Sequence, residues 1–155
     1  MSFRIAGLKR ADFSPLFDLD DEALAGRGVL RMTAGAKPGF PCRIGLRDLE
    51  PGERALLLNH EHQPADTPFR ASHAIFVGER SEEAAPSPGE VPEVLRLRPL
   101  SIRAFDARGM MTDADLADGR EAEALIERLL ADEQVAYLDI HYARRGCWAA
   151  RAERA

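Results

Sequence analysis

Hydrophobic and polar residues alternate through two neighbouring segments, and a period of two is typical of β-strands. In segment 55–62 one face collects two leucines and two histidines: Leu56, Leu58, His60 and His62. In segment 72–77 the matching face collects His73, Ile75 and Val77. The stretch between them, 63–71, contains Pro64 and Pro68 and is long enough for an antiparallel return. The pattern therefore predicts a hairpin.

The pairing of these two strands follows from their apolar faces. A slip of one residue would move every side chain to the other face of the sheet, so both faces must enter the same core. The pairing that we expect joins Leu58 with Val77, His60 with Ile75, and His62 with His73. Directly opposed residues have Cβ atoms about 5 Å apart. Three imidazoles are thus predicted to lie near one end of the hairpin.

Two segments carry helical signals. Asp118 is a suitable N-cap with Glu121 three residues later, and an apolar stripe with helical spacing follows: Ala122, Leu125, Ile126, Leu129 and Leu130. This pattern predicts a helix near 119–132. A shorter helix is predicted near 20–25, before Gly26 and Gly28.

The remaining pattern is mostly that of strands. We expect extended segments at 3–8, 29–33, 42–46, 94–106 and 110–116, and a C-terminal hairpin of 135–142 and 147–151. Many strands with one strong helix favour an α+β fold with a mainly antiparallel sheet. One core suffices for this length, so 1–155 is predicted to be a single domain. Segment 80–92, rich in Ser, Glu, Ala and Pro, is predicted to be a mobile loop.

Charge and composition narrow the class of protein. A net charge of −5, from 21 basic and 26 acidic residues, argues against binding driven by nucleic-acid phosphates. No apolar run approaches the length of a membrane span or a signal peptide. Cys42 and Cys147 lie far apart in sequence and are expected to be free thiols. We therefore expect a cytoplasmic protein that binds neither nucleic acid nor a membrane, while no pattern indicates its oligomeric state.

The histidines suggest a metal site. Imidazole nitrogens bind zinc, iron or copper, and His60, His62 and His73 would converge from one strand face. One hypothesis is therefore that they hold a divalent transition metal. The alternative is that they end the core with their nitrogens satisfied by the protein. The cupin pattern is not followed, because Arg54 stands where cupins have a glycine, and no His-Glu-x-x-His motif occurs.

Arginines suggest an anion site. A guanidinium group recognises carboxylate or phosphate through two parallel hydrogen bonds. Four arginines lie in or near the predicted strands: Arg43, Arg47, Arg70 and Arg103. The alternative is that they pair with nearby acids, namely Asp48, Glu53 or Asp66.

Four further residues are candidates for chemistry. Asp139 and His141 share one face of a predicted strand, where the carboxylate could orient the imidazole for acid or base catalysis. Cys42 or Cys147 could be a nucleophile if a neighbouring histidine or arginine lowered its pKa. The alternative for both cysteines is a small buried hydrophobic side chain.

Several runs of sequence resemble those of a known family. They are 41–48 (PCRIGLRD), 51–54 (PGER), 57–62 (LLNHEH), 69–77 (FRASHAIFV), 103–106 (RAFD), 109–111 (GMM) and 144–147 (RRGC). The family is the bacterial domain of unknown function 1203 (DUF1203), and the resemblance spans nearly the whole chain. It implies a stand-alone bacterial domain with no established activity and no assigned catalytic residues.

Two functional hypotheses result. The first is a pocket for a small molecule, in one version anionic and in one version catalytic, lined by His60, His62, His73, Arg43 and Arg70. The histidines would act as ligands or as acid and base groups, and the arginines, with Arg103, as anion anchors. The rival hypothesis is a noncatalytic structural or interaction domain, in which an exposed sheet edge meets a partner.

Overall fold

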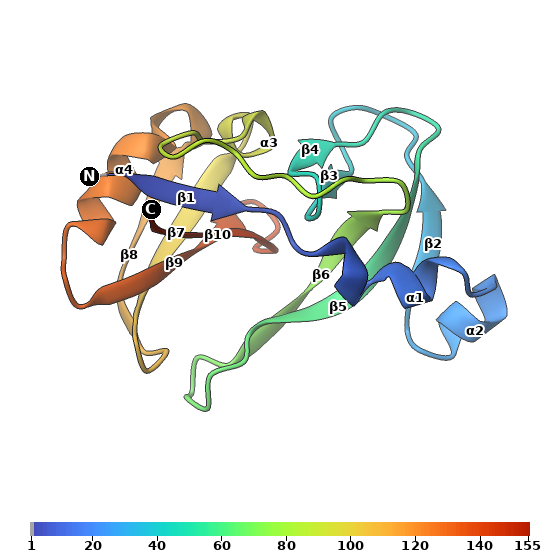
Figure 1. Cartoon of the computed structure of the whole chain (residues 1–155), viewed down its shortest axis with the longest axis horizontal. Helices are drawn as coiled ribbons and strands as arrows, with labels where there is room; N and C mark the ends of the chain where they lie inside the picture. The colour runs from blue at the N-terminus through green and yellow to red at the C-terminus, as the bar shows by residue number, and fades with distance from the viewer. Residues whose placement is uncertain (1) are drawn as a thin grey trace.

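The computed structural model describes residues 2–155, which form two five-stranded sheets (Figure 1). Sheet A has the order β1 (Phe3–Ala6), β10 (Trp148–Arg154), β9 (Val135–Tyr142), β7 (Pro99–Asp106) and β8 (Met111–Asp118). Sheet B has the order β2 (Leu30–Thr33), β5 (Arg54–Gln63), β6 (Ala71–Gly78), β3 (Pro41–Cys42) and β4 (Arg47–Asp48). Neighbouring strands are antiparallel except β3 and β6. The predicted α+β class is confirmed, with the strands divided between two sheets.

Few helices accompany the strands. They are η1 (Arg10–Asp12), α1 (Ser14–Phe17), α2 (Asp21–Ala25), α3 (Glu93–Arg96), η2 (Gly119–Glu121) and α4 (Ala122–Leu130). The two predicted helices are confirmed. The expected N-cap Asp118 accepts a hydrogen bond from the Arg120 N–H, and Asp20 caps the shorter helix by accepting one from Ala23. No helix in the described chain is long and apolar enough to cross a membrane.

Each sheet has its own apolar core. The stripe of α4 packs on the inner face of sheet A, where Leu100, Ile102, Leu138 and Ile140 are fully buried. Sheet B packs with α2 in a second cluster around Leu56, Ile75 and Val77. Each core also contains a side chain from the other half: Leu46 from the β3–β4 turn lies in the core of sheet A, and Trp148 from β10 lies in that of sheet B.

Two strand predictions are wrong in part. Segment 42–46 is not extended, because the chain turns after Cys42 and Leu46 adopts a left-handed φ of 47°. Segment 94–106 begins with the helix α3, which buries Val94 and Leu95 against the core of sheet A. Short apolar runs fit a helical turn as well as a strand, so their period does not distinguish the two.

The predicted register of the β5–β6 hairpin is wrong by two residues. The structure pairs Leu58 with Ile75 and His60 with His73, and a bulge follows before Gln63 pairs with Ala71. A shift of an even number of residues keeps each side chain on its predicted face, so apolar alternation cannot detect it. Turn geometry and the bulge set the register instead.

The segment after β6 contains no helix or strand until α3. It runs along β1 in Figure 1 and is fastened by backbone hydrogen bonds, from Gly89 to the Phe3 carbonyl and from Ala84 to the Ile44 carbonyl. The first of these bonds pairs a backbone group on the outer edge of β1, which would otherwise be unpaired, and the second joins the segment to the β3–β4 turn. The mobility of 80–92 and the single-domain organisation stay predictions.

Candidate functional site

The far end of the β5–β6 hairpin lies against the polar face of sheet A. Cross-strand pairs put side chains on the same face, and in sheet A these pairs are Ser101 with His141, Arg103 with Asp139, Arg151 with Asp139, and Trp148 with His141. The opposite face of the same strands carries the apolar core. Histidines of sheet B therefore meet an acid and a histidine of sheet A. We call Asp139, His62, His73, His141 and Arg103 the histidine site.

Three imidazoles are in direct contact at this site. His62 Nε2 lies 2.6 Å from His73 Nδ1, and their ring centroids are 4.8 Å apart. The ring of His141 stands edge-on to both, at 5.1 Å from His62 and 5.2 Å from His73. His62 Nδ1 faces Asp139 Oδ2 at 3.6 Å. A row of acid, imidazole and imidazole thus runs from the interior towards the half-exposed His73.

Asp139 is the buried end of this row. It is 0% exposed and accepts hydrogen bonds from Trp148 Nε1 at 3.2 Å and from Arg151 Nε at 2.9 Å. Burial alone would raise the pKa of Asp139, but the interactions with His62, Arg151 and Trp148 outweigh it and lower the pKa. Asp139 is therefore a carboxylate at neutral pH.

An ionised Asp139 determines where the imidazole protons lie. It favours a proton on His62 Nδ1, which leaves Nε2 of His62 as an acceptor for the Nδ1–H of His73. His73 Nε2 then carries a free lone pair. His141 donates its Nδ1–H to the Gly146 carbonyl at 2.9 Å, so its Nε2 is also unprotonated. These tautomers follow from the hydrogen-bond partners.

One contact in the row is incomplete. His62 Nδ1 is buried and, within residues 2–155, has no hydrogen-bond partner, since 3.6 Å to Asp139 is too long for a hydrogen bond. Catalytic hydrogen bonds are often long without ligand and shorten when the ligand binds.

Two of the histidines, His73 and His141, are poised to be neutral. Burial lowers the pKa of His73, with further contributions from His62, Arg103 and Arg43. Burial also lowers the pKa of His141 to about 4, and the Arg103 charge acts in the same direction. Neutral imidazoles beside positive guanidinium groups can accept a proton when an anion arrives.

His60 lies beside this site rather than in the row. Its ring packs between Phe13, at 6.1 Å, and Trp148, at 5.4 Å, and burial lowers its pKa. No group of three or more His, Cys, Asp or Glu side chains is arranged to hold a metal ion in the described part of the chain. The metal hypothesis for His60, His62 and His73 stays a prediction.

The three arginines predicted as anion anchors have different surroundings. Arg70 forms a surface ion pair with Glu61 at 3.2 Å. Arg43 is 3% exposed, donates to the Trp148 carbonyl at 3.0 Å and lies over the Tyr142 ring, so it joins the two sheets and cannot reach solvent. Arg103 is half-buried, donates to Ser101 Oγ at 3.3 Å and has no carboxylate within ion-pair distance among residues 2–155.

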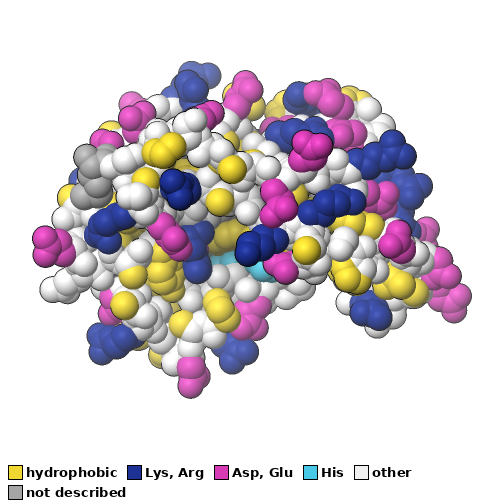
Figure 2. All heavy atoms as spheres, viewed as in Figure 1, with side chains coloured by type: hydrophobic (Ala, Val, Ile, Leu, Met, Phe, Trp, Pro, Cys, Tyr) yellow, Lys and Arg dark blue, Asp and Glu magenta, His cyan; other side chains and the backbone are white. Residues whose placement is uncertain are grey.

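His73 and Arg103 are the partly exposed members of the histidine site. Figure 2 shows a small area of histidine atoms at the surface near the middle of the molecule, with charged groups of both signs around it. Two surface hollows, each of about 650 Å³, contain no histidine. One is lined by residues of 49–54 and 78–81, and the other lies between β8 and α4.

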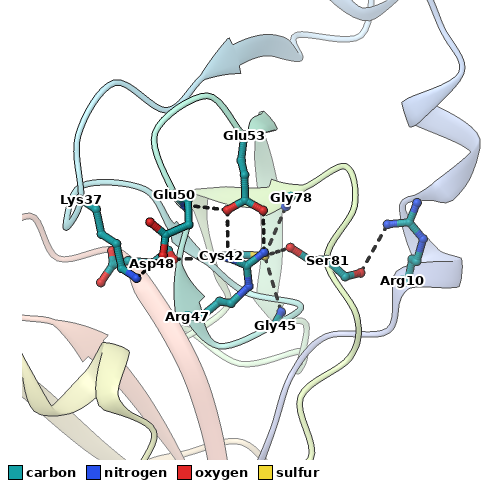
Figure 3. A network of polar contacts seen from close by, with 10 residues as sticks. All are labelled: Arg10, Lys37, Cys42, Gly45, Arg47, Asp48, Glu50, Glu53, Gly78 and Ser81. Carbon is teal, nitrogen blue, oxygen red and sulfur yellow. Dashed lines mark hydrogen bonds and ion pairs between the residues drawn. The ribbon is translucent and has the colours of Figure 1, made fainter.

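Cys42 occupies a separate cluster in sheet B (Figure 3). Its sulfur accepts hydrogen bonds from the Gly78 N–H at 3.2 Å and the Gly45 N–H at 3.5 Å, and lies 3.2 Å from Ser81 Oγ. Cys42 is 1% exposed, an environment that suits a buried structural thiol. Cys147 is half-buried and precedes β10. A nucleophilic role for either cysteine stays a prediction.

The same cluster contains an ion pair with a predicted dependence on pH. Two hydrogen bonds from Arg47 chiefly lower the pKa of Glu53 from 4.5 to about 2. Glu53 therefore stabilises the fold fully above pH ~4.5 and loses this contribution as the pH falls towards ~2. Because both side chains are partly exposed, we expect Glu53→Gln to lower the free energy of unfolding by about 1 kcal/mol at pH 7, and by almost nothing at pH 2. Urea denaturation at the two pH values measures this, and an equal loss at both would contradict it.

Sequence reasoning missed part of the site. Trp148 and Arg151 hold Asp139 in place, and Arg151 also donates to the His62 carbonyl at 2.9 Å. A bulge between Trp148 and Ala150 breaks the period of two in β10, so the alternation there hides that both residues face the histidines.

The geometry defines an α+β protein with two sheets and a candidate acid–base site where they meet. The family model described as "Protein of unknown function (DUF1203)" matches residues 39–154, and the chain belongs to this family. The matched range includes every residue of the histidine site. No curated protein and no solved structure matches the chain.

Proposed function

We propose that this protein binds a small anionic molecule at the histidine site, with Arg103 as the anion anchor and His73 Nε2 as the atom that accepts or donates a proton. The observation that carries the proposal is the half-buried Arg103, which forms no ion pair with a carboxylate of residues 2–155 and lies beside a row of histidines ordered by Asp139. Membership of the family supplies no activity.

Charge supports an anion as the ligand. Asp139 already pairs with Arg151 and Arg70 with Glu61, whereas Arg103 and the buried Arg43 keep their positive charges. Burial lowers the pKa of both Arg103 and Arg43, which shows that desolvation disfavours their charged forms. An anion bound to Arg103 would offset part of that cost through charge-assisted hydrogen bonds.

The row of side chains supports proton transfer. His62 positions His73 by accepting its Nδ1–H, and Asp139 positions His62 across the sheet boundary. With its Nδ1 proton held inward, His73 can take a proton at Nε2 and share the resulting charge with His62 and Asp139. Asp139 and His62 are thus positioning residues, and His73 is the candidate general base.

Histidine side-chain ¹H–¹⁵N spectra test the proposal with acetate and phosphate as probes. In the wild type we expect at least one probe to shift the His73 ring resonances and to raise the pKa of His73, because a nearby negative charge favours imidazolium. Arg103→Gln should weaken binding by about tenfold or more, since hydrogen bonds to charged groups contribute about 1.5–3 kcal/mol. Arg70→Gln is the matched control and should bind as the wild type does.

Two results would overturn the proposal: no response of the His73 ring to either probe, or the same response in Arg103→Gln as in the wild type. Either result would favour the rival function, a noncatalytic structural or interaction domain. That rival rests on the hydrogen bonds by which Arg43 and Arg151 fasten one sheet to the other.

A further inference from the structure

The open side of the histidine site is formed by three strands of sheet A and combines one accessible cation with apolar surface. Ser101 pairs with Leu116 of β8 on one side and with His141 of β9 on the other, so all three side chains share a face. Arg103 leans towards this group, since its Nε donates to Ser101 Oγ at 3.3 Å. Leu116 is 69% exposed, among the most exposed large hydrophobic side chains of residues 2–155.

The number of accessible guanidinium groups indicates which anion fits. One planar guanidinium binds one carboxylate or one phosphate through two parallel hydrogen bonds, but its single positive charge balances only a singly charged group such as a carboxylate. Arg43 adds positive charge but is 3% exposed and committed to backbone carbonyls, so it cannot contact a ligand directly. Arg103 is therefore left as the direct partner of a singly charged group.

The apolar surface beside Arg103 indicates the rest of the ligand. Ala114 lies directly opposite Arg103 on β8, and Leu116 lies two residues further along the same face. Asp113 and Asp115 point to the other side of the sheet, where Arg128 of α4 pairs with them. The part of β8 beside Arg103 is thus apolar, with Asp113 and Asp115 turned away from the anion anchor.

We infer that the ligand class is a monocarboxylate with an aliphatic part, whose carboxylate binds Arg103 and Ser101 and whose hydrocarbon lies on Ala114 and Leu116. This inference rests on the proposed anion site and adds the chemical class of its ligand. The carboxylate would lie on the same face as His141 and next to the free lone pair of His73.

Isothermal titration calorimetry with a homologous series tests the inference: formate, acetate, butyrate and hexanoate, with succinate and inorganic phosphate for comparison. Full burial of a methylene tightens binding by about fourfold, and coverage on one side by about half of that free energy, so we expect about twofold per added methylene. Leu116→Ser should flatten the series while acetate still binds. Leu30→Ser, which changes a leucine that is 55% exposed on sheet B, is the matched control and should leave the series unchanged.

The outcomes separate this inference from the proposed function. Affinity that depends on Arg103 but not on chain length, or tighter binding of phosphate or succinate than of hexanoate, would overturn the ligand class and leave the anion site standing. Binding of none of the probes, or binding equally strong in Arg103→Gln, would overturn both.

Discussion

Asp139→Asn is expected to lower the free energy of unfolding by about 3–5 kcal/mol, because removing one partner of a buried ion pair leaves the other charge uncompensated. Asp139 is 0% exposed and receives hydrogen bonds from Arg151 and Trp148. An asparagine keeps the shape but loses the negative charge that faces Arg151 and His62. Urea denaturation at pH 7 measures the loss.

The control for this variant is Asp66→Asn, which changes an exposed aspartate in the β5–β6 turn and should alter stability by less than about 0.5 kcal/mol. Asp139→Asn should also change the histidine row, because without a carboxylate at position 139 His62 is no longer held with its proton on Nδ1. A stable Asp139→Asn protein with unaltered His62 and His73 resonances would show that Asp139 does not order the row.

Gly7→Ala should be at least as damaging, with an expected loss of about 3 kcal/mol or more. A Cβ at this position would lie 1.9 Å from the Ile44 carbonyl oxygen and 3.2 Å from the Ala84 nitrogen. Both neighbours are backbone atoms, so no side-chain rotation can relieve the overlap. Thermal denaturation measures the loss as a lowered midpoint.

The matched control is Gly35→Ala, because a Cβ there meets no atom within 4 Å. It should leave the midpoint within a few degrees of the wild type. Equal effects at Gly7 and Gly35 would mean that the crossing of the chain beside Ile44 is loose in solution.

Local pattern was sufficient to predict several elements. The stripe of α4 and the N-cap Asp118 of η2, which leads into α4, were recognisable because helical spacing and capping depend on neighbours in sequence. The faces of β5 and β6 were also predicted correctly, although their register was not. The alternation of apolar and polar residues shows on which face of the sheet a residue lies, but it does not determine which residue of the neighbouring strand is paired with it.

The candidate site itself was only half predictable. His62 and His73 share a hairpin, so their contact follows from local pairing. The approach of Asp139 and His141 depends on how two sheets pack, and no local period encodes that arrangement. Arg43 and Arg103 looked equivalent in the sequence, yet one is committed to backbone carbonyls and the other forms no ion pair in the described chain.

The exchange of Leu46 and Trp148 between the cores has a consequence for the site. Each half of the protein completes its interior with a side chain supplied by the other. His62 lies on sheet B and Asp139 on sheet A, so the distance between them depends on how both cores are packed. An evolutionary substitution in either core therefore alters the placement of the imidazoles relative to Asp139, even when the substituted side chain lies far from them.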